Sequence, residues 1–270
     1  MGMNEGDRLR RVAMCAPGDE YFNVEDLQAH NINEPADREL TGVQHNALRG
    51  LLEKAGAEVV LLPEHVGQPN SVFTRDSALV VGEGHIRVRM GLSSRQGETI
   101  WMSDHLEAMG LPCLGEIEAP GTVEGGDVIL MGEVAFVGLS CRSNEAGVAQ
   151  LKTILTGLGY EVRIAQVADD AMHIGGVMSA IGPRRVVCCA DRFPEGYFDG
   201  FDTVEIGFLN PSSGNVICLG ENEAVVNIAE NGVTASALAE QGVTIFDLDL
   251  SEFRKGAGGP TCLILPLERG

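Results

Sequence analysis

Two hydrophobic patterns alternate along this chain and predict different elements. The first is a short apolar run that opens after polar or glycine residues and ends at a Gly or Pro turn, which is typical of a β-hairpin. The second is an apolar residue every three or four positions, which predicts the buried face of an amphipathic helix. We expect such helices at 38–54, 99–110 and 144–157, and a strand after glycine at 57–63 and 160–165. The mixture predicts an α/β protein.

The hairpin pattern is repeated five times at nearly constant spacing. Its copies cover residues 70–88, 123–139, 172–189, 211–228 and 258–270. The polar residues that stand before the apolar strands are Asp76, Glu124, His173, Asn215 and Cys262, so the steps are 48, 49, 42 and 47 residues. Since no such unit can bury a core alone, we predict a ring with helices outside and the starts of the strands at its centre. We expect one domain, 1–270; the alternative is a two-domain α/β protein with accidental spacing.

Composition narrows the classes of partner. The chain is 44% hydrophobic and 21% charged, which suits a soluble globular protein. Its formal net charge of −20 disfavours nucleic acid and anionic membranes, whose phosphates need Lys and Arg, and mildly favours a small cationic substrate. The first residues contain no apolar signal region, and no apolar run approaches the roughly 18 residues of a membrane helix. We therefore expect a cytoplasmic protein; the oligomeric state, including a homo-oligomer, stays open.

The chain has seven cysteines, an odd number, and none forms a CxxC pair. This spacing disfavours a disulfide framework or a zinc site and favours reduced thiols. Cys262 alone follows two glycines and a proline and precedes an apolar run. A buried core thiol is the ordinary interpretation of such a residue, and a catalytic nucleophile is the other.

A ring of this kind brings four chemically active side chains together, namely Asp76, Glu124, His173 and Cys262. A thiol needs a base or a lowered pKa to act as a nucleophile, a histidine transfers protons near neutral pH, and a carboxylate orients that histidine or binds a cation. Each motif also has a structural interpretation: "EGGD" (124–127) as a turn and "FTRD" (73–76) as an exposed ion pair. Their equivalent places in one repeat favour the catalytic interpretation.

The motifs resemble those of the guanidine-modifying superfamily, which includes arginine deiminases, dimethylargininases, arginine dihydrolases and amidinotransferases. The resemblance rests on "FTRD", "EGGD", a histidine that opens the third repeat and "GGPTC" (258–262), and it covers about residues 8–268. The stretch "GGDVILMGEVAFVGLSCRSNEAGVAQL" is especially similar to dimethylargininases. The resemblance implies a five-bladed α/β propeller (the pentein fold) with pseudo-fivefold ββαβ repeats. It also implies a hydrolase of C–N bonds in linear amidines, for which no metal or organic cofactor is required.

The resemblance implies roles for eight residues. Cys262 matches the nucleophile, His173 the general acid/base, and Glu124 the carboxylate that pairs with the substrate guanidinium and the histidine. The matched substrate-binding residues are Asp76 for the guanidinium, Arg89 and Arg142 for the α-carboxylate, Asn70 at the substrate, and Asn23 as the residue that closes the pocket in arginine dihydrolases.

The implied substrate is a small cationic guanidino compound, but the subfamilies differ over which one. Gly175 stands where arginine deiminases carry an aspartate, and Asn70 and Arg75 stand where dimethylargininases usually carry acidic residues. Because "FTRD" and Asn70 are expected at the substrate, we expect hydrolysis of arginine through a covalent thiouronium intermediate, either to citrulline or, in a dihydrolase, to ornithine. One alternative is a dimethylargininase that releases dimethylamine. Another is a non-catalytic binding ring of the ribosome anti-association type, against which the intact Cys262, His173 and Glu124 argue.

Overall fold

Five sheets of three strands each form the framework of the protein. The computed structural model describes residues 3–270. In four sheets an antiparallel hairpin is extended by a third strand that pairs parallel with the central strand. These sheets are β3 (Leu79–Val81), β4 (Gly84–Arg87) and β5 (Cys113–Glu116); β6 (Val128–Met131), β7 (Val134–Leu139) and β8 (Glu161–Gln166); β9 (Met178–Gly182), β10 (Arg185–Cys188) and β11 (Asp202–Glu205); and β12 (Ile217–Gly220), β13 (Glu223–Asn227) and β14 (Thr244–Leu248).

Positive backbone φ angles explain three of the hairpin turns. Gly82, Gly132 and Asn222 have φ of 61°, 65° and 58°. Glycine, and to a lesser degree asparagine, adopts this left-handed region at low cost, which is why tight hairpins select these residues. The turns predicted from the sequence are therefore confirmed at these positions.

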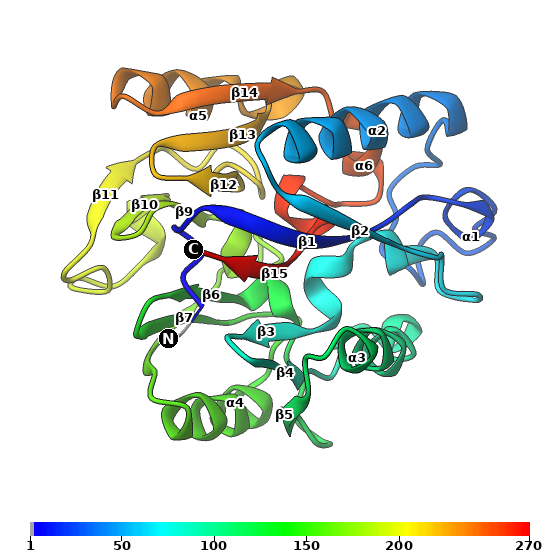
Figure 1. The fold of residues 1–270 in the computed structure, drawn as a ribbon, viewed down its shortest axis with the longest axis horizontal. Coiled ribbons are helices and arrows are strands. Elements are labelled where there is room, and N and C mark those ends of the chain that lie inside the picture. The colour runs from blue at the N-terminus through cyan, green and yellow to red at the C-terminus, as the bar shows by residue number, and fades with distance from the viewer. Residues whose placement is uncertain (1–2) are drawn as a thin grey trace.

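The fifth sheet joins the two ends of the chain. Strand β1 (Leu9–Cys15) lies between β15 (Leu265–Arg269), with which it pairs antiparallel, and β2 (Glu58–Leu62), with which it pairs parallel. Figure 1 shows the blue β1 directly beside the red β15. The last repeat has only one apolar strand of its own, so the N-terminal segment supplies its partner and closes the ring. The predicted five-bladed α/β propeller is confirmed.

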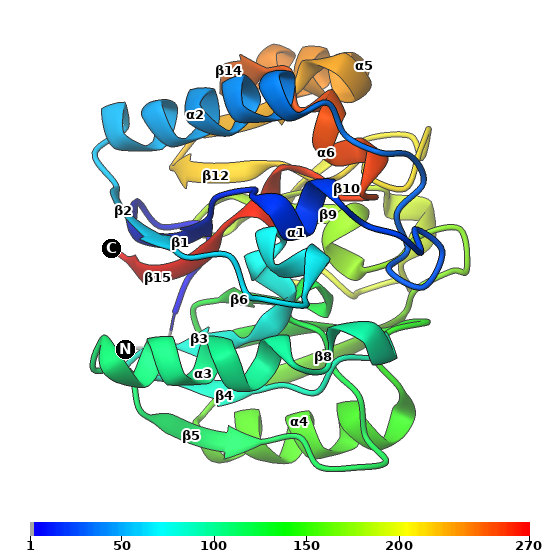
Figure 2. The same ribbon diagram turned by 90° about the vertical axis from the view of Figure 1, so that its right-hand side faces the viewer.

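Four longer helices cover the outside of the sheets in both views (Figures 1 and 2). They are α2 (Arg38–Lys54), α3 (Glu98–Ala108), α4 (Glu145–Gly157) and α5 (Ile228–Glu240); the short helices are α1 (Asp19–Phe22) and α6 (Ser251–Lys255). Helices α2 and α4 begin where the side chains of Asp37 and Asn144 accept backbone N–H groups of the first turn. The three predicted helices are confirmed to within two residues at each end, whereas α5 was not predicted.

Between β10 and β11 the third blade has only a 3₁₀ turn, at Ala190–Arg192, and no α-helix. A cluster of aromatic side chains takes its place, in which Phe193, Tyr197 and Phe198 lie against one another and the latter two against Phe136 of β7. Aromatic rings supply a large buried area in few residues, which fits the short step of this repeat.

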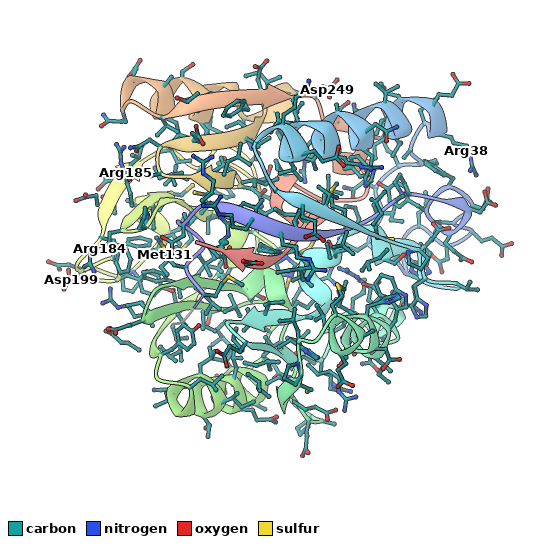
Figure 3. All side chains as sticks on the ribbon, viewed as in Figure 1. Arg38, Met131, Arg184, Arg185, Asp199 and Asp249 are labelled. Atoms are coloured by element: carbon teal, nitrogen blue, oxygen red, sulfur yellow. The ribbon has the colours of Figure 1, made fainter. Side chains whose placement is uncertain are left out.

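Charged side chains lie at the rim of the molecule, as the labelled and exposed Arg38, Asp199 and Asp249 illustrate in Figure 3. Apolar side chains fill the space between helices and sheets, including Met102 of α3 and Leu151 of α4 in one shared core. Among residues 3–270, no helix is both long enough and apolar enough to cross a membrane.

Candidate active site

Four short 3₁₀ turns meet at the centre of the ring. They cover Thr74–Ser77, Gly125–Asp127, Ile174–Gly176 and Pro260–Leu263. The first packs against the second and the fourth, and the second packs against the third. Each turn leads into the first strand of its repeat, so the polar residues of four different blades are delivered to one place. The convergence predicted from the repeat is therefore present in the structure.

Glycines in these turns allow the close approach. A Cβ atom on Gly126 would lie 2.7 Å from Asp76 Oδ1 and 2.8 Å from His173 Nδ1. A Cβ atom on Gly259 would lie 2.8 Å from the side chain of Asn215. No residue with a side chain fits at such distances unless its neighbours move. The glycines of "EGGD" and "GGPTC" thus bring the polar residues of adjacent blades into contact.

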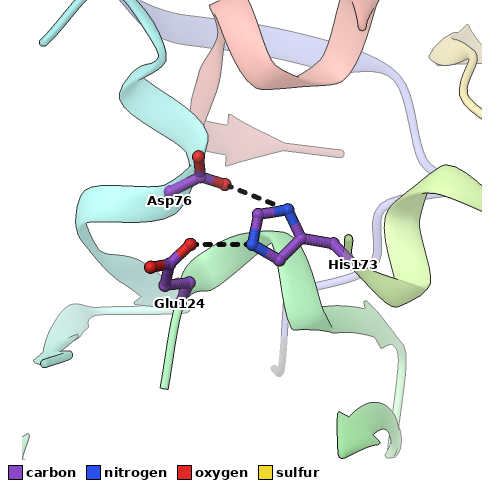
Figure 4. Close-up of side chains that lie close together, drawn as sticks. All are labelled: Asp76, Glu124 and His173. Carbon is purple, nitrogen blue, oxygen red and sulfur yellow. Dashed lines mark hydrogen bonds and ion pairs between the residues drawn. The ribbon is translucent and has the colours of Figure 1, made fainter. Parts of the chain in front are cut away.

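Asp76, Glu124 and His173 form a buried cluster (Figure 4). His173 Nε2 lies 2.8 Å from Glu124 Oε2, and His173 Nδ1 lies 3.9 Å from Asp76 Oδ1. The second oxygen of Glu124, Oε1, accepts the backbone N–H of Gly91 at 3.0 Å. Both oxygens of Glu124 are therefore held, and the imidazole lies between two carboxylates.

The buried charges determine which of these groups carries a proton. Burial alone would lower the pKa of His173, but the negative charges of Asp76, Asp127 and Glu124 outweigh it and raise this pKa to about 9. Burial would raise the pKa of Glu124, but His173 and two arginines hold it below its ordinary range. At neutral pH the site accordingly contains an imidazolium paired with an ionised glutamate.

Cys262 lies in the last of the four turns and is half-buried. Its Sγ accepts the backbone N–H of Gly259 at 3.4 Å. Burial, assisted by the negative charge of Asp76, raises the pKa of Cys262 to about 11, so the thiol is neutral at pH 7 in the free protein. A cation bound beside Asp76 would oppose this shift and favour the thiolate.

A cavity of about 350 Å³ and a smaller one of about 20 Å³ meet at this cluster. His173, Cys262 and Arg142 line both, and Asn70 and Asp76 line the smaller one. Arg142 is buried, with Nη1 3.8 Å from Glu124 Oε1. Five of the eight predicted site residues thus line these cavities, and a sixth, Glu124, is fully buried and bonds to His173.

Two buried oxygens in the small cavity lack a hydrogen-bond partner within the described part of the chain. They are Asn70 Oδ1 and Asp76 Oδ1. The amide nitrogen of Asn70 donates to the carbonyl of His30 at 3.1 Å, which fixes the orientation of the Asn70 oxygen. Buried acceptors without a donor are costly, so these two atoms mark a place where a ligand could donate N–H groups.

Arg89 and Asn23 lie apart from this pocket. Arg89 donates to the carbonyl of Gly121 at 3.2 Å, and Asn23 is exposed at the end of α1; neither lines the two cavities. Their substrate roles stay predictions.

Arg95 is a site residue that the sequence pattern does not predict. Its guanidinium donates to Asp76 Oδ2 at 2.7 Å and to both oxygens of Glu98, and it lines the small cavity. Burial raises the pKa of Glu98 to about 7 despite this pairing. The only sequence signal is the three-residue spacing of Arg95 and Glu98 at the start of a helix, which is common on protein surfaces.

Asp76, Glu124 and His173 also meet the distance requirement for a metal site, because one ligand atom from each lies within 4.8 Å of the others. The two carboxylates can instead hold the nitrogens of an organic cation by charge-assisted hydrogen bonds. The partnerless oxygens and the thiol beside them fit the second chemistry better, since a guanidinium offers several N–H donors to oxygen acceptors.

Comparison with known proteins agrees with this arrangement. The family profile described as "N,N dimethylarginine dimethylhydrolase, eukaryotic" matches residues 13–269. The N(G),N(G)-dimethylarginine dimethylaminohydrolase of Pseudomonas aeruginosa is 28% identical over 242 residues, which cover 90% of this chain and 94% of that protein.

Solved structures show the same fold. A cysteine-to-serine mutant of the dimethylarginine enzyme from Pseudomonas aeruginosa, complexed with citrulline, superimposes with a TM-score of 0.83 at 24% identity and covers 96% of this chain and 99% of its own. The product-bound N-terminal domain of ArgZ, an arginine dihydrolase from the ornithine-ammonia cycle in cyanobacteria, gives a TM-score of 0.84 at 21% identity, covering 97% and 98%. The predicted superfamily and enzyme class are confirmed: this chain belongs to the dimethylarginine dimethylaminohydrolase family of guanidine-modifying hydrolases, which act on C–N bonds of linear amidines.

Proposed function

We propose that this protein hydrolyses arginine itself, with Cys262 as the nucleophile and a covalent thiouronium intermediate. The observation that carries the choice of substrate is the pair of partnerless buried oxygens, Asn70 Oδ1 and Asp76 Oδ1. The terminal nitrogens of arginine carry N–H groups that these acceptors can receive. In asymmetric dimethylarginine one terminal nitrogen carries two methyl groups and no N–H. A buried acceptor left unpaired costs about 1–3 kcal/mol, so this pocket favours the unmethylated cation.

The free state of the site suits the first chemical step. The guanidinium binds between Asp76 and Glu124, and its positive charge lowers the pKa of the Cys262 thiol. The thiol releases its proton to solvent, and the resulting thiolate attacks the guanidinium carbon. His173, whose pKa of about 9 keeps it protonated at neutral pH, then donates its proton to the departing nitrogen, which leaves as ammonia.

The second step uses the same histidine in the opposite sense. Deprotonated His173 takes a proton from a water molecule, which attacks the thiouronium carbon and releases citrulline. In a dihydrolase a second round on citrulline gives ornithine, carbon dioxide and a second ammonia, and we favour this outcome. The larger cavity supports it, because His173 and Gly175 both line this cavity and a catalytic water can stand there.

Substrate recognition completes the proposal. We assign the α-carboxylate to Arg142, which lines both cavities, and retain Arg89 as a second carboxylate-binding residue and Asn23 as a pocket-closing residue, as the family resemblance implies. The substrate is a small cationic molecule, in keeping with the net charge of −20.

Hydrolysis of asymmetric dimethylarginine to citrulline and dimethylamine is the second candidate. The matching family profile over residues 13–269 and the 28% identical relative from Pseudomonas aeruginosa favour it. The space beside Gly175 could hold a methyl group as well as a water molecule.

One experiment separates the candidates. The protein is incubated with arginine, asymmetric dimethylarginine and agmatine, and the products are identified by mass spectrometry, with ammonia and dimethylamine counted per substrate consumed. We expect two ammonia and one ornithine per arginine. One ammonia and one citrulline would reduce the proposal to a deiminase, and faster release of dimethylamine than of ammonia would replace it by the second candidate.

A further inference from the structure

Asp127, the last residue of "EGGD", is completely buried and accepts three hydrogen bonds. Its Oδ2 accepts the hydroxyls of Ser140 and Ser143, each at 2.6 Å. Its Oδ1 accepts the backbone N–H of Ile174 at 3.0 Å. Burying a charged carboxylate away from solvent costs free energy, and the three hydrogen bonds offset this cost. The groups that donate these bonds therefore indicate what the carboxylate does.

Each of the three contacts ends at a residue of the active site. The hydroxyl of Ser143 accepts the backbone N–H of Glu124 at 3.1 Å, and the hydroxyl of Ser140 accepts the backbone N–H of Arg142 at 3.0 Å. The third donor is the peptide group that directly follows His173. One carboxylate is therefore connected to Glu124 and Arg142 of the second blade and to His173 of the third, which have three different proposed roles.

The surroundings fix this carboxylate in place. A Cβ atom on Gly138, in the neighbouring strand β7, would lie 2.7 Å from Asp127 Oδ1. Glycine at that position makes the space that the carboxylate occupies, and three hydrogen bonds hold the carboxylate there. Burial raises the pKa of Asp127 to about 6, so the group is ionised at neutral pH and adds its negative charge to the site.

We propose that Asp127 is the positioning residue of this site, which sets Glu124, Arg142 and His173 in their working arrangement through Ser143, Ser140 and the Ile174 peptide. The inference rests on the proposed function for the roles of those three residues. It does not require Asp127 to touch the substrate, since no atom of Asp127 lines either cavity.

The first test needs no substrate. Asp127→Asn keeps the size of the side chain and removes its charge. The protonation of His173 is followed by NMR of histidine-labelled protein, with its signal assigned by its loss in His173→Gln. The other charged groups that act on His173 are Asp76 and Glu124, and Cys262 and Arg142 line both cavities beside it; all four are retained.

We expect the midpoint of His173 titration to fall by roughly one pH unit or more in Asp127→Asn. Glu252→Gln is the matched control, because Glu252 is another buried carboxylate that accepts a backbone N–H, that of Asp37, and it lines neither cavity. This control should leave the midpoint unchanged. An unchanged midpoint in Asp127→Asn as well would overturn the inference, whatever the protein turns over.

The second test uses the two serines to distinguish the link from Asp127 to Glu124 from the link to Arg142. Ser143→Ala cuts the link to Glu124 and should lower kcat roughly 10-fold or more with little change in KM. Ser140→Ala cuts the link to Arg142 and also removes the bond that Ser140 Oγ accepts from the backbone N–H of Ser143 at 3.1 Å. It should raise KM for the carboxylate-bearing substrate more than Ser143→Ala does. Asp127→Asn should do both, to roughly 100-fold in kcat/KM, since small displacements in an active site have costs of this size.

Ser103→Ala is the control for the serine variants, because Ser103 is a buried serine that bonds His85 away from the site. Wild-type kinetics in Asp127→Asn, or the same kinetic change in both serine variants, would overturn the inference while the proposed function stands. If the wild-type protein turned over no guanidino compound, the proposed function would fail, and the NMR titration would still decide the role of Asp127.

Discussion

His173 Nε2 lies 2.8 Å from Glu124 Oε2, and both side chains are buried, so water does not screen the charges of this pair. An ion pair in such a place is strong only while the histidine is protonated. The pair therefore links the chemistry of the site to the stability of the fold, and pH is the variable that exposes the link.

The stability of the wild-type protein should fall as His173 loses its proton. The pKa of His173 is raised in the folded state from 6.5 to about 9, so its contribution to the free energy of unfolding is complete below about pH 6.5 and is lost as the pH rises through 9. Urea unfolding gives the free energies of unfolding of the wild type and of His173→Gln. The difference between these two free energies should be about 3 kcal/mol smaller at pH 10 than at pH 6. A difference that does not change with pH would contradict the assigned shift.

Cys262 should be the only cysteine whose loss abolishes turnover. Cys262→Ser removes the sulfur nucleophile without adding bulk, so activity should disappear while circular dichroism and the urea midpoint stay close to wild type. Cys141→Ser is the matched control, since Cys141 is exposed at the wall of the same cavity. Mass spectrometry of quenched reactions should find the substrate-derived adduct on Cys262. An adduct on Cys141 would refute the assignment.

Gly126→Ala should disable the site while the propeller still folds. The new methyl group would stand 2.8 Å from His173 Nδ1 and 2.7 Å from Asp76 Oδ1, so one of these groups must move. We expect a loss of roughly 100-fold in kcat/KM. Gly157→Ala at the end of α4 is the control, because nothing lies within 4 Å of its Cβ position. Equal activity in the two variants would show that His173 has room to spare.

The ring and most of its centre could be predicted because they depend on local patterns. Apolar periodicity and turn glycines mark each blade, and the polar residue before each strand marks its inner end, so Asp76, Glu124, His173 and Cys262 followed from the repeat. The fourth outer helix, α5, was not predicted, because over a short window the sequence pattern of an apolar strand and that of an apolar helix face are alike.

Arg95 could not be predicted, for a different physical reason. It lies in the same connection as Arg89, between β4 and α3, and the path of such a connection depends on tertiary contacts. The path taken directs Arg95 toward Asp76 and leaves Arg89 on the Gly121 carbonyl. Only its tertiary partners identify an arginine as a site residue, and the partner of Arg95 in the site, Asp76, comes from a different segment.

Arg142 and Arg89 should differ in their effect on substrate binding. Lysine keeps the charge but loses the planar, two-pronged donor geometry that suits a carboxylate. Arg142→Lys should raise KM for arginine about 10-fold or more and leave KM for agmatine, which lacks the carboxylate, nearly unchanged. Arg89→Lys should have the smaller effect, since Arg89 lines neither cavity. Agmatine as the better substrate of the wild type would remove the basis for both assignments.

Asn70 should discriminate between the two candidate substrates. Its buried Oδ1 has no partner in residues 3–270, and its amide nitrogen is engaged by His30, so the oxygen is available only to a ligand. A hydrogen bond to a charged group contributes about 1.5–3 kcal/mol, which corresponds to roughly 10- to 100-fold in kcat/KM. Asn70→Ala should therefore lower kcat/KM for arginine by that factor.

The effect on asymmetric dimethylarginine should be smaller, because its methylated nitrogen has no N–H for Asn70 to accept and the shortened side chain makes room for a methyl group. The ratio of the two specificity constants, measured with one enzyme preparation, cancels any general damage to the site. Gln44→Ala is the control, since Gln44 is a buried amide that bonds Ser251 and Glu252 and lines neither cavity. If Asn70→Ala lowered both constants equally, Asn70 would serve only to hold the segment that contains His30, and the preference for arginine would have to come from Asp76 alone.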